Sequence, residues 1–235
     1  MSNSKRFLDD FVKLEMYLKK YLNNPKVGFV QMVHMAAKTQ ATIKRHSNDL
    51  IEFAQLRNAI VHNRIGEDEA IAEPHDRVVE LMDRIVDQVT EPKRVRHFCK
   101  DKPVYYAAPH DNLATVLLHQ QKHNYSVVPI YDGQQYVGML HYRLYQRLLE
   151  RYAYKNLKLD EMLVEDVLEF YEKDDRVMFF SENTELDIIV DRIMQLSEKG
   201  RTVIAIVVSR SGHLNDVPVG IITMADLPRI IRELE

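Results

Sequence analysis

The sequence predicts an α+β protein in which a four-helix up-and-down bundle precedes two copies of a β-α-β-β-α module. Through the first ninety residues apolar side chains recur every three or four positions, which is the period of an amphipathic helix. Beyond residue 103 short β-favouring runs alternate with helical stretches, and this order occurs twice. Two similar runs, residues 138–144 and 220–226, stand 82 positions apart at the last strand-to-helix junction of each copy. We therefore expect the C-terminal half to be a duplication.

Length and composition set the class of protein. The chain has 235 residues, of which 46% are hydrophobic and 29% charged, enough for two folded domains. The longest strongly apolar run, residues 203–208, is far shorter than the ~20 residues of a membrane-spanning helix. No apolar signal core follows the first residues, and the single Cys99 allows no intramolecular disulfide. We expect a cytoplasmic protein that makes no use of a membrane.

The bundle is expected at residues 1–90. Its helices are predicted at residues 7–21, 27–45, 50–62 and about 78–86, with an acidic loop at 66–74 before the last. Short joins between consecutive helices favour antiparallel neighbours. Residues 91–103 are basic and carry a proline near each end, so we expect them to be a linker.

The two modules are expected at residues 104–154 and 177–235, joined by a charged, periodic helix at 155–176. Asp132 and Gly133 between two β-favouring runs indicate a hairpin in the first module. The elements expected in the first module are a strand (104–107), a helix (112–124), two strands (126–131 and 136–140) and a helix (141–151). Those expected in the second are a strand (177–180), a helix (184–199), two strands (203–209 and 217–222) and a helix (224–234).

A hydroxyl and a carboxylate stand at the start of the last helix. Thr223 and Asp226 would lie beside unpaired helix N–H groups, where a phosphorylated, ribose-bearing ligand could be held. The same Thr-x-x-Asp spacing is close to a capping box, which needs no ligand. Pro228 follows closely, so we expect an irregular first turn or a helix that begins nearer Asp226.

The module order, the hairpin at residues 126–133 and the run at 220–226 resemble a pair of cystathionine-β-synthase-type (CBS) domains over roughly residues 101–235. The resemblance implies two modules packed sheet to sheet, with clefts that bind adenine nucleotides or related adenosyl ligands. The regulatory ligand would then be AMP, ADP, ATP or S-adenosylmethionine.

The same resemblance assigns roles to single residues. Thr223 would bond the ribose-phosphate, and Asp226 would accept hydrogen bonds from the ribose hydroxyls. Met178 and Phe180 on the entry strand of the second module would flank the base. Arg201, just before the next strand, is a candidate phosphate contact by its position and charge alone.

The first module departs from this pattern, because His141 and Leu144 stand where the second has Thr223 and Asp226. A leucine side chain cannot accept a hydrogen bond from a ribose hydroxyl. We expect this first site to be empty, altered or filled by side chains, and one competent site per chain.

A second motif lies in the predicted third helix. Arg57 falls at the centre of an apolar stripe, and Asn58 and His62 share a face four residues apart. This Arg-Asn…His pattern resembles the HEPN family of helical bundles. The resemblance implies a homodimer with a shared cleft and metal-independent ribonuclease activity. His62 would transfer a proton, Arg57 would stabilise charge on the phosphate, and Asn58 would orient the site.

Other interpretations stay open for these residues. Arg57 could form an internal ion pair with Glu52 or Asp49, and His62 could simply favour the dipole at a helix C-terminus. The acid-free basic stretch at residues 16–48 could meet RNA phosphates or be a solvated helix face.

Together these features indicate an adenine-nucleotide sensor whose CBS pair regulates a HEPN-like domain. The alternative is a non-catalytic sensor whose helical domain dimerises or binds a partner protein or RNA. A third possibility is a CBS scaffold without a ligand. No metal is required by any of these interpretations, and the absence of a P-loop argues against nucleotide hydrolysis.

Overall fold

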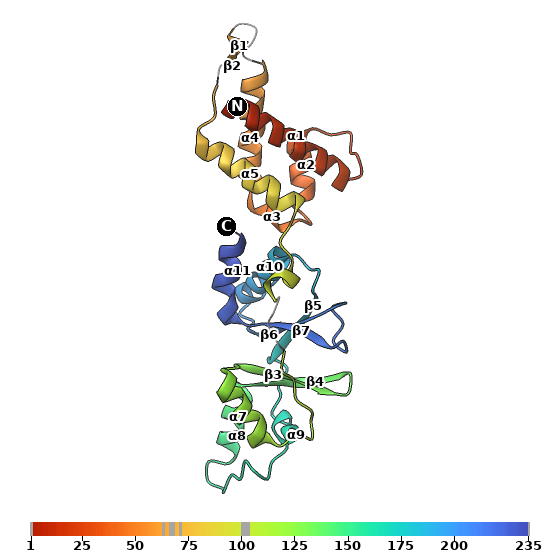
Figure 1. Cartoon of the computed structure of the whole chain (residues 1–235), viewed down its shortest axis with the longest axis vertical. Helices are drawn as coiled ribbons and strands as arrows, with labels where there is room; N and C mark the ends of the chain where they lie inside the picture. Colours follow the sequence, from red (N-terminus) through yellow and green to blue (C-terminus); the bar gives the residue numbers. More distant parts are fainter. Residues whose placement is uncertain (1, 63, 66–68, 71, 100–103, 235) are drawn as a thin grey trace. The chain divides into compact units, whose positions relative to one another are not determined.

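The computed structural model describes residues 2–62, 64–65, 69–70, 72–99 and 104–234 (Figure 1). The chain is 53% helical and 16% strand, and it divides into two compact units, Met1–Lys93 and Arg94–Glu233. None of the helices in these ranges is long and apolar enough to cross a membrane.

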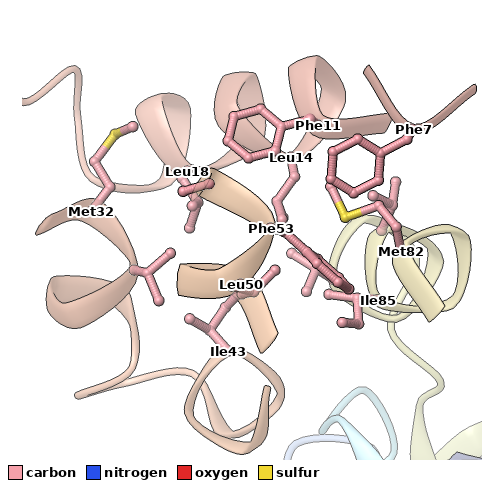
Figure 2. Packing of buried hydrophobic residues seen from close by; sticks show 14 of the residues in the cluster. Phe7, Phe11, Leu14, Leu18, Met32, Ile43, Leu50, Phe53, Met82 and Ile85 are labelled. Atoms are coloured by element: carbon pink, nitrogen blue, oxygen red, sulfur yellow. The ribbon is translucent and has the colours of Figure 1, made fainter. Parts of the chain in front are cut away.

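The first unit is helical. Its helices are α1 (Asn3–Tyr21), α2 (Phe29–Ala36), α3 (Ala41–Arg45), α4 (Ser47–His62) and α5 (Asp76–Thr90). Figure 2 shows the apolar side chains of α1, α2, α4 and α5 that converge on one core. Phe7 meets Phe53 edge to face, with ring centroids 5.6 Å apart, which joins α1 to α4. Of the apolar stripe that the sequence predicts for α1, Tyr21 is exposed and the other four residues are buried here: Phe7, Phe11, Leu14 and Leu18.

The expectation of one helix over residues 27–45 is wrong, because the chain turns between α2 and α3. Gln40 is extended, with φ −111° and ψ 116°, and its N–H donates to the carbonyl of Ala36. The side chains of Thr39 and Gln40 form hydrogen bonds with Tyr21 and Tyr17 of α1. The turn thus keeps the helical hydrogen bond from Gln40 to Ala36, and side-chain hydrogen bonds to α1 are added to it. The acidic segment expected as a loop at 66–74 contains a short strand, β2 (Glu69–Ala70), which pairs with β1 (Arg64–Ile65).

The second unit contains two β/α layers. Module 1 (residues 104–168) contains α7 (Leu113–His123), β3 (Val127–Asp132), β4 (Gln135–His141), α8 (Tyr142–Arg151) and α9 (Val164–Leu168). β3 and β4 form the expected antiparallel hairpin, and Gly133 takes the left-handed φ of +59° that its turn needs. Of the strand expected at 104–107, only Ala107 pairs, in a parallel bridge to Ile130.

Module 2 (residues 176–234) has a three-stranded sheet in the order β5-β6-β7. Its elements are β5 (Arg176–Ser181), α10 (Leu186–Glu198), β6 (Val203–Ser209), β7 (Pro218–Ile222), the 3₁₀ turn η1 (Met224–Asp226) and α11 (Leu227–Leu234). β5 is parallel to β6, and β6 is antiparallel to β7. The irregular turn expected before Pro228 is confirmed by η1.

The two modules contact each other through their sheets. Val127 and Met139 of module 1 cluster with Ala205 and Val207 of module 2, all four buried. The rings of Tyr136 and Phe179 meet at a centroid distance of 4.9 Å. This apolar layer holds the last strand-to-helix junction of each module close to the other module.

Two expected connections are wrong. Residues 155–176 are not a helix: only Val164–Leu168 is helical, and the N–H of Val164 donates back to Asp111 of module 1. Part of the expected linker at 91–103 is folded, because α6 (Val95–Phe98) hydrogen-bonds to the β5–α10 turn of module 2. Cys99 then lies against Gly220, where a Cβ would stand 2.6 Å from the sulfur. Residues 100–103 lie outside the described part.

Candidate functional site

A cleft of about 600 Å³ lies between the two modules. One wall comes from the start of module 1 and its α7–β3 turn, and the other from the end of β7 and η1 of module 2. The described residues that line it are Val104, Tyr105, His123, Asn124, Tyr125, Ser126, Val127, Ile221, Thr223, Ala225 and Asp226. The two modules thus bring sequence-distant segments to a single concave site.

Thr223 and Asp226 form the polar part of the module 2 wall. β7 ends at Ile222, and Thr223 is extended before the chain turns into η1. The carboxylate of Asp226 accepts hydrogen bonds from the N–H of Thr223 at 3.0 Å and from its hydroxyl at 3.2 Å. The capping arrangement is therefore present, and it fixes both groups at the cleft. A ligand that bonds Asp226 would share or replace these internal hydrogen bonds.

Aromatic rings form the module 1 wall. The rings of Tyr105 and Tyr125 are nearly parallel, 17° apart, with centroids separated by 6.3 Å. His123 is also nearly parallel to Tyr125, at 5.5 Å. Asn124 in the left-handed conformation, φ 55°, ends α7 and turns the chain into β3, which places Tyr125 beside Tyr105. Burial raises the pKa of Tyr105, so its ring stays uncharged at neutral pH.

Sequence reasoning missed this aromatic wall. Tyr105 and Tyr125 belong to different elements, which are brought together by the parallel bridge between Ala107 and Ile130 and by the contact of Tyr105 with His119 of α7, at a centroid distance of 3.9 Å. The recurrence of aromatic residues around both ends of α7 was the available signal.

Three of the expected ligand contacts lie elsewhere. Met178 and Phe180 are on β5, opposite Ile206 and Val208 of β6, and neither is among the described residues that line the cleft. Their neighbours Val177 and Phe179 are the β5 residues that pack against module 1. Arg201 lines a smaller, separate pocket of about 220 Å³ together with Met224. Of the expected set, only Thr223 and Asp226 are brought together at the cleft.

The corresponding junction of module 1 is filled. Leu144 is fully buried in the module 1 core. His141 is 1% exposed, and its Nε2 lies 3.7 Å from a carboxylate oxygen of Asp175. Of the three expectations for this position, the structure shows the one in which side chains occupy it.

In the helical unit, Arg57 and Asn58 are in contact. Nη1 of Arg57 donates to Oδ1 of Asn58 at 3.2 Å, and the guanidinium lies 6.0 Å from the ring centroid of Phe11. The internal ion pair expected as an alternative is not seen with either acid, since Asp49 contacts His46 instead and Glu52 is exposed. His62 is the last residue of α4, and its side chain lies outside the described part.

Comparison with known proteins identifies part of the second unit. Residues 95–143 match the family model of the CBS domain. The chain contains a CBS domain. The match runs from α6 into the start of α8, so it includes the aromatic wall of the cleft. No curated protein sequence matches the chain.

The chain is also similar to solved CBS structures. A putative signal-transduction protein with CBS domains from Burkholderia ambifaria is 16% identical over 59% of this chain and 93% of its own, with a TM-score of 0.43. The CBS domain pair of protein MJ0100, in complex with 5′-methylthioadenosine and S-adenosyl-L-methionine, is 17% identical over 61% and 99%, with a TM-score of 0.44. CbpB in complex with c-di-AMP is 15% identical over 66% and 93%, with a TM-score of 0.45. The assignment of residues 95–143 rests on the family model.

Among the residues with described side chains, no group of three or more His, Cys, Asp or Glu is placed to hold a metal ion.

Proposed function

We propose that this protein senses an adenosyl ligand, an adenine nucleotide or S-adenosylmethionine, in the cleft between its two modules. One observation carries the proposal. The hydroxyl of Thr223 and the carboxylate of Asp226 face the same cleft as the paired rings of Tyr105 and Tyr125, although the two pairs come from different modules. The CBS domain at residues 95–143 supports the same function.

Each wall suits one part of such a ligand. The carboxylate of Asp226 accepts hydrogen bonds from two ribose hydroxyls, and the hydroxyl of Thr223 serves the ribose or its phosphate. A planar base gains stacking energy against Tyr105 and Tyr125, while Val104 on the same wall excludes water. No Lys or Arg is found among the described residues of the cleft, so the adenosine moiety supplies most of the affinity.

Ligand binding is coupled to the rest of the chain through module 2. Because the cleft is built from both modules, the ligand favours the module arrangement in which both walls reach it. α6 is the first helix after residue 93, and it is hydrogen-bonded to the β5–α10 turn of module 2. A shift of module 2 therefore moves the segment that enters it from the helical unit.

The helical unit is the output of this sensor. We assign it a HEPN-like role in a homodimer, in which paired copies of Arg57, Asn58 and His62 cleave RNA without a metal. The contact between Arg57 and Asn58 on α4 is the observation that favours this assignment. The alternative output is a non-catalytic helical domain that dimerises or binds a partner protein or RNA.

A binding panel tests the ligand proposal. Thermal-shift titrations of the full chain with adenosine, AMP, ADP, ATP, S-adenosylmethionine, 5′-methylthioadenosine and c-di-AMP should show saturable stabilisation by at least one compound. Asp226→Asn should lower the affinity for that compound about tenfold or more, because a charge-assisted hydrogen bond contributes roughly 1.5–3 kcal/mol. Glu198→Gln, which removes an exposed carboxylate at the end of α10, is the matched control. No stabilisation by any of the seven compounds would contradict the proposal and favour a ligand-free scaffold.

An RNA digest separates the two outputs. Wild-type chain, His62→Ala and Arg57→Ala are incubated with several RNAs in EDTA, with and without the compound identified by the panel. Cleavage by the wild type that both variants lose supports the ribonuclease. Intact RNA in every reaction supports the non-catalytic sensor.

A further inference from the structure

The strand-to-helix junction of module 1 holds a buried carboxylate. The side chain of Asp175 is 0% exposed, and both guanidinium nitrogens of Arg147 contact it, with Nη2 3.2 Å from Oδ1. The backbone N–H of Glu172 donates to Oδ2 at 2.9 Å. A carboxylate removed from water in this way is stable only with such partners. Burial by itself would raise the pKa of Asp175, but the hydrogen bonds from Arg147 and Glu172 hold it below its usual value.

Two further nitrogen-bearing side chains face the same carboxylate. Nε2 of His141 lies 3.7 Å from Oδ1, and Nη1 of Arg143 lies 3.9 Å from it. His141 is 1% exposed, yet neither of its ring nitrogens has a hydrogen-bond partner among the described residues. Burial lowers the pKa of His141, so the ring is neutral at pH 7. The side chain of Glu172, which is mostly exposed, also contacts Arg147 at 2.9 Å.

Asp175 lies close to the position that is equivalent to a residue of the ligand cleft. Ile130 pairs with Gly138 and Val208 pairs with Gly220, so Ile130 and Val208 are equivalent. Their partners are Ala107 and Phe180, and counting back three residues gives Val104 and Val177. Val104 lines the cleft, and Asp175 lies two residues before Val177, against His141, the counterpart of Thr223. A carboxylate of the chain itself therefore lies in the second junction.

We propose that His141, Arg143 and Arg147 form an anion-binding site in module 1, and that the carboxylate of Asp175 is its resident anion. Asp175 comes from the segment that leads into β5, whereas the other three residues belong to β4 and α8. The site therefore also ties the two modules together. Only when Asp175 loses its charge does the site accept an external oxyanion such as phosphate. This proposal does not depend on adenosyl binding at Thr223 and Asp226.

Inorganic phosphate is the probe for this site. The thermal midpoint of the full chain is measured in sodium phosphate and in sodium chloride of equal ionic strength, for the wild type, Asp175→Asn and Asp174→Asn. Asp174 is the exposed neighbour, so its variant controls for the general stabilisation that phosphate gives to folded proteins. The rise in thermal midpoint from chloride to phosphate should be larger in Asp175→Asn than in Asp174→Asn by about 2–4 °C, when the phosphate concentration is several times the dissociation constant. It should fall back to the control value in Asp175→Asn/Arg147→Gln.

Equal phosphate responses in Asp175→Asn and Asp174→Asn overturn the proposal. If Asp175→Asn is unfolded in chloride, the readout becomes its refolding yield in phosphate relative to chloride. A higher yield in phosphate supports the anion site, and equal yields overturn it. Asp175→Glu, which keeps the charge, should respond to phosphate as the wild type does. Failure of the adenosyl panel leaves this experiment unaffected, since its probe contains no nucleoside.

Discussion

The last strand-to-helix junctions of the two modules differ in what lies beside them. In module 2, the carboxylate of Asp226 accepts hydrogen bonds from Thr223, and both residues line a cleft of about 600 Å³. In module 1, His141 and Leu144 are buried, and a carboxylate oxygen of Asp175 lies 3.7 Å from Nε2 of His141. Of two similar junctions, one can thus stay open to a ligand while the other is filled by side chains of the chain itself.

The largest change in the free energy of unfolding should appear when the carboxylate of Asp175 is removed. Asp175→Ala leaves Arg147 partly buried without its main partner, and removal of one partner of a buried pair costs about 3–5 kcal/mol. Urea unfolding should therefore show that the free energy of unfolding falls by an amount near the lower end of this range, because the side chain of Arg147 is partly exposed. Asp174→Ala should stay within about 0.5 kcal/mol of the wild type. Equal stabilities of the two variants would show that module 1 does not depend on its carboxylate.

The glycine that opens each junction provides the second comparison. A Cβ on Gly220 would stand 2.6 Å from the sulfur and 2.7 Å from the Cβ of Cys99. A Cβ on Gly138 would stand 2.9 Å from a terminal methyl of Leu168, which can rotate away. Gly220→Ala should therefore lower the free energy of unfolding, measured in urea, by about 1–3 kcal/mol, and Gly138→Ala should lower it clearly less. Cys99→Ala in the Gly220→Ala background should restore part of the loss, and a further loss there would contradict the packing of α6 on β7.

Removal of the aromatic wall should weaken ligand binding without unfolding the chain. Tyr105→Ala and Tyr125→Ala should each lower the affinity for the adenosyl compound about tenfold, since base stacking contributes about 1–3 kcal/mol. Arg201→Ala should change it less than twofold, because Arg201 lines a separate pocket. Isothermal titration calorimetry measures all three. A tenfold loss of affinity in Arg201→Ala with none in the tyrosine variants would place the ligand in the smaller pocket that Arg201 lines.

Mild acid, between pH 7 and about pH 5.5, should act mainly on module 1. Burial lowers the pKa of His141 in the folded chain. As the pH falls below the ordinary histidine pKa of about 6.5, this side chain is therefore protonated in the unfolded chain before it is protonated in the folded chain. The free energy of unfolding falls as a result. The lowered pKa of Asp175 adds a further loss below about pH 4. Thermal midpoints of the wild type should fall between pH 7 and pH 5.5 by more than those of His141→Gln. Parallel curves for the two proteins would exclude His141 as the responsible group.

The sequence predicted those features that local pattern determines. A continuous apolar run identified β6 with the bounds that the structure has, and Pro228 indicated the irregular turn at η1. The break between α2 and α3 was missed because it depends on hydrogen bonds to Tyr17 and Tyr21 of another helix. The helix expected at 155–176 is limited to α9, because the backbone N–H groups of Val164 and Glu165 at its start donate to Asp111 and Pro109 instead of to a preceding helical turn.

The candidate site was predictable only in part. Thr223 and Asp226 form a contiguous motif, so their spacing alone placed them together. The position of Tyr105 at the cleft depends on the register of a parallel bridge, and the position of Asp175 beside His141 depends on the register of β5. No local sequence pattern reveals either register. Met178 and Phe180 lie on β5 and outside the described lining of the cleft, which instead joins the end of β7 to the segment at residues 104–105 and the α7–β3 turn of module 1.

The stoichiometry of ligand binding tests the comparison most directly. Calorimetric titration of the wild type with the compound selected by the panel should give one ligand per chain, since Asp175 fills the second junction. Asp226→Asn should abolish or weaken this single event about tenfold or more, whereas Asp174→Asn should leave it unchanged. Two equivalent sites per chain, or binding that Asp226→Asn does not alter, would contradict the account.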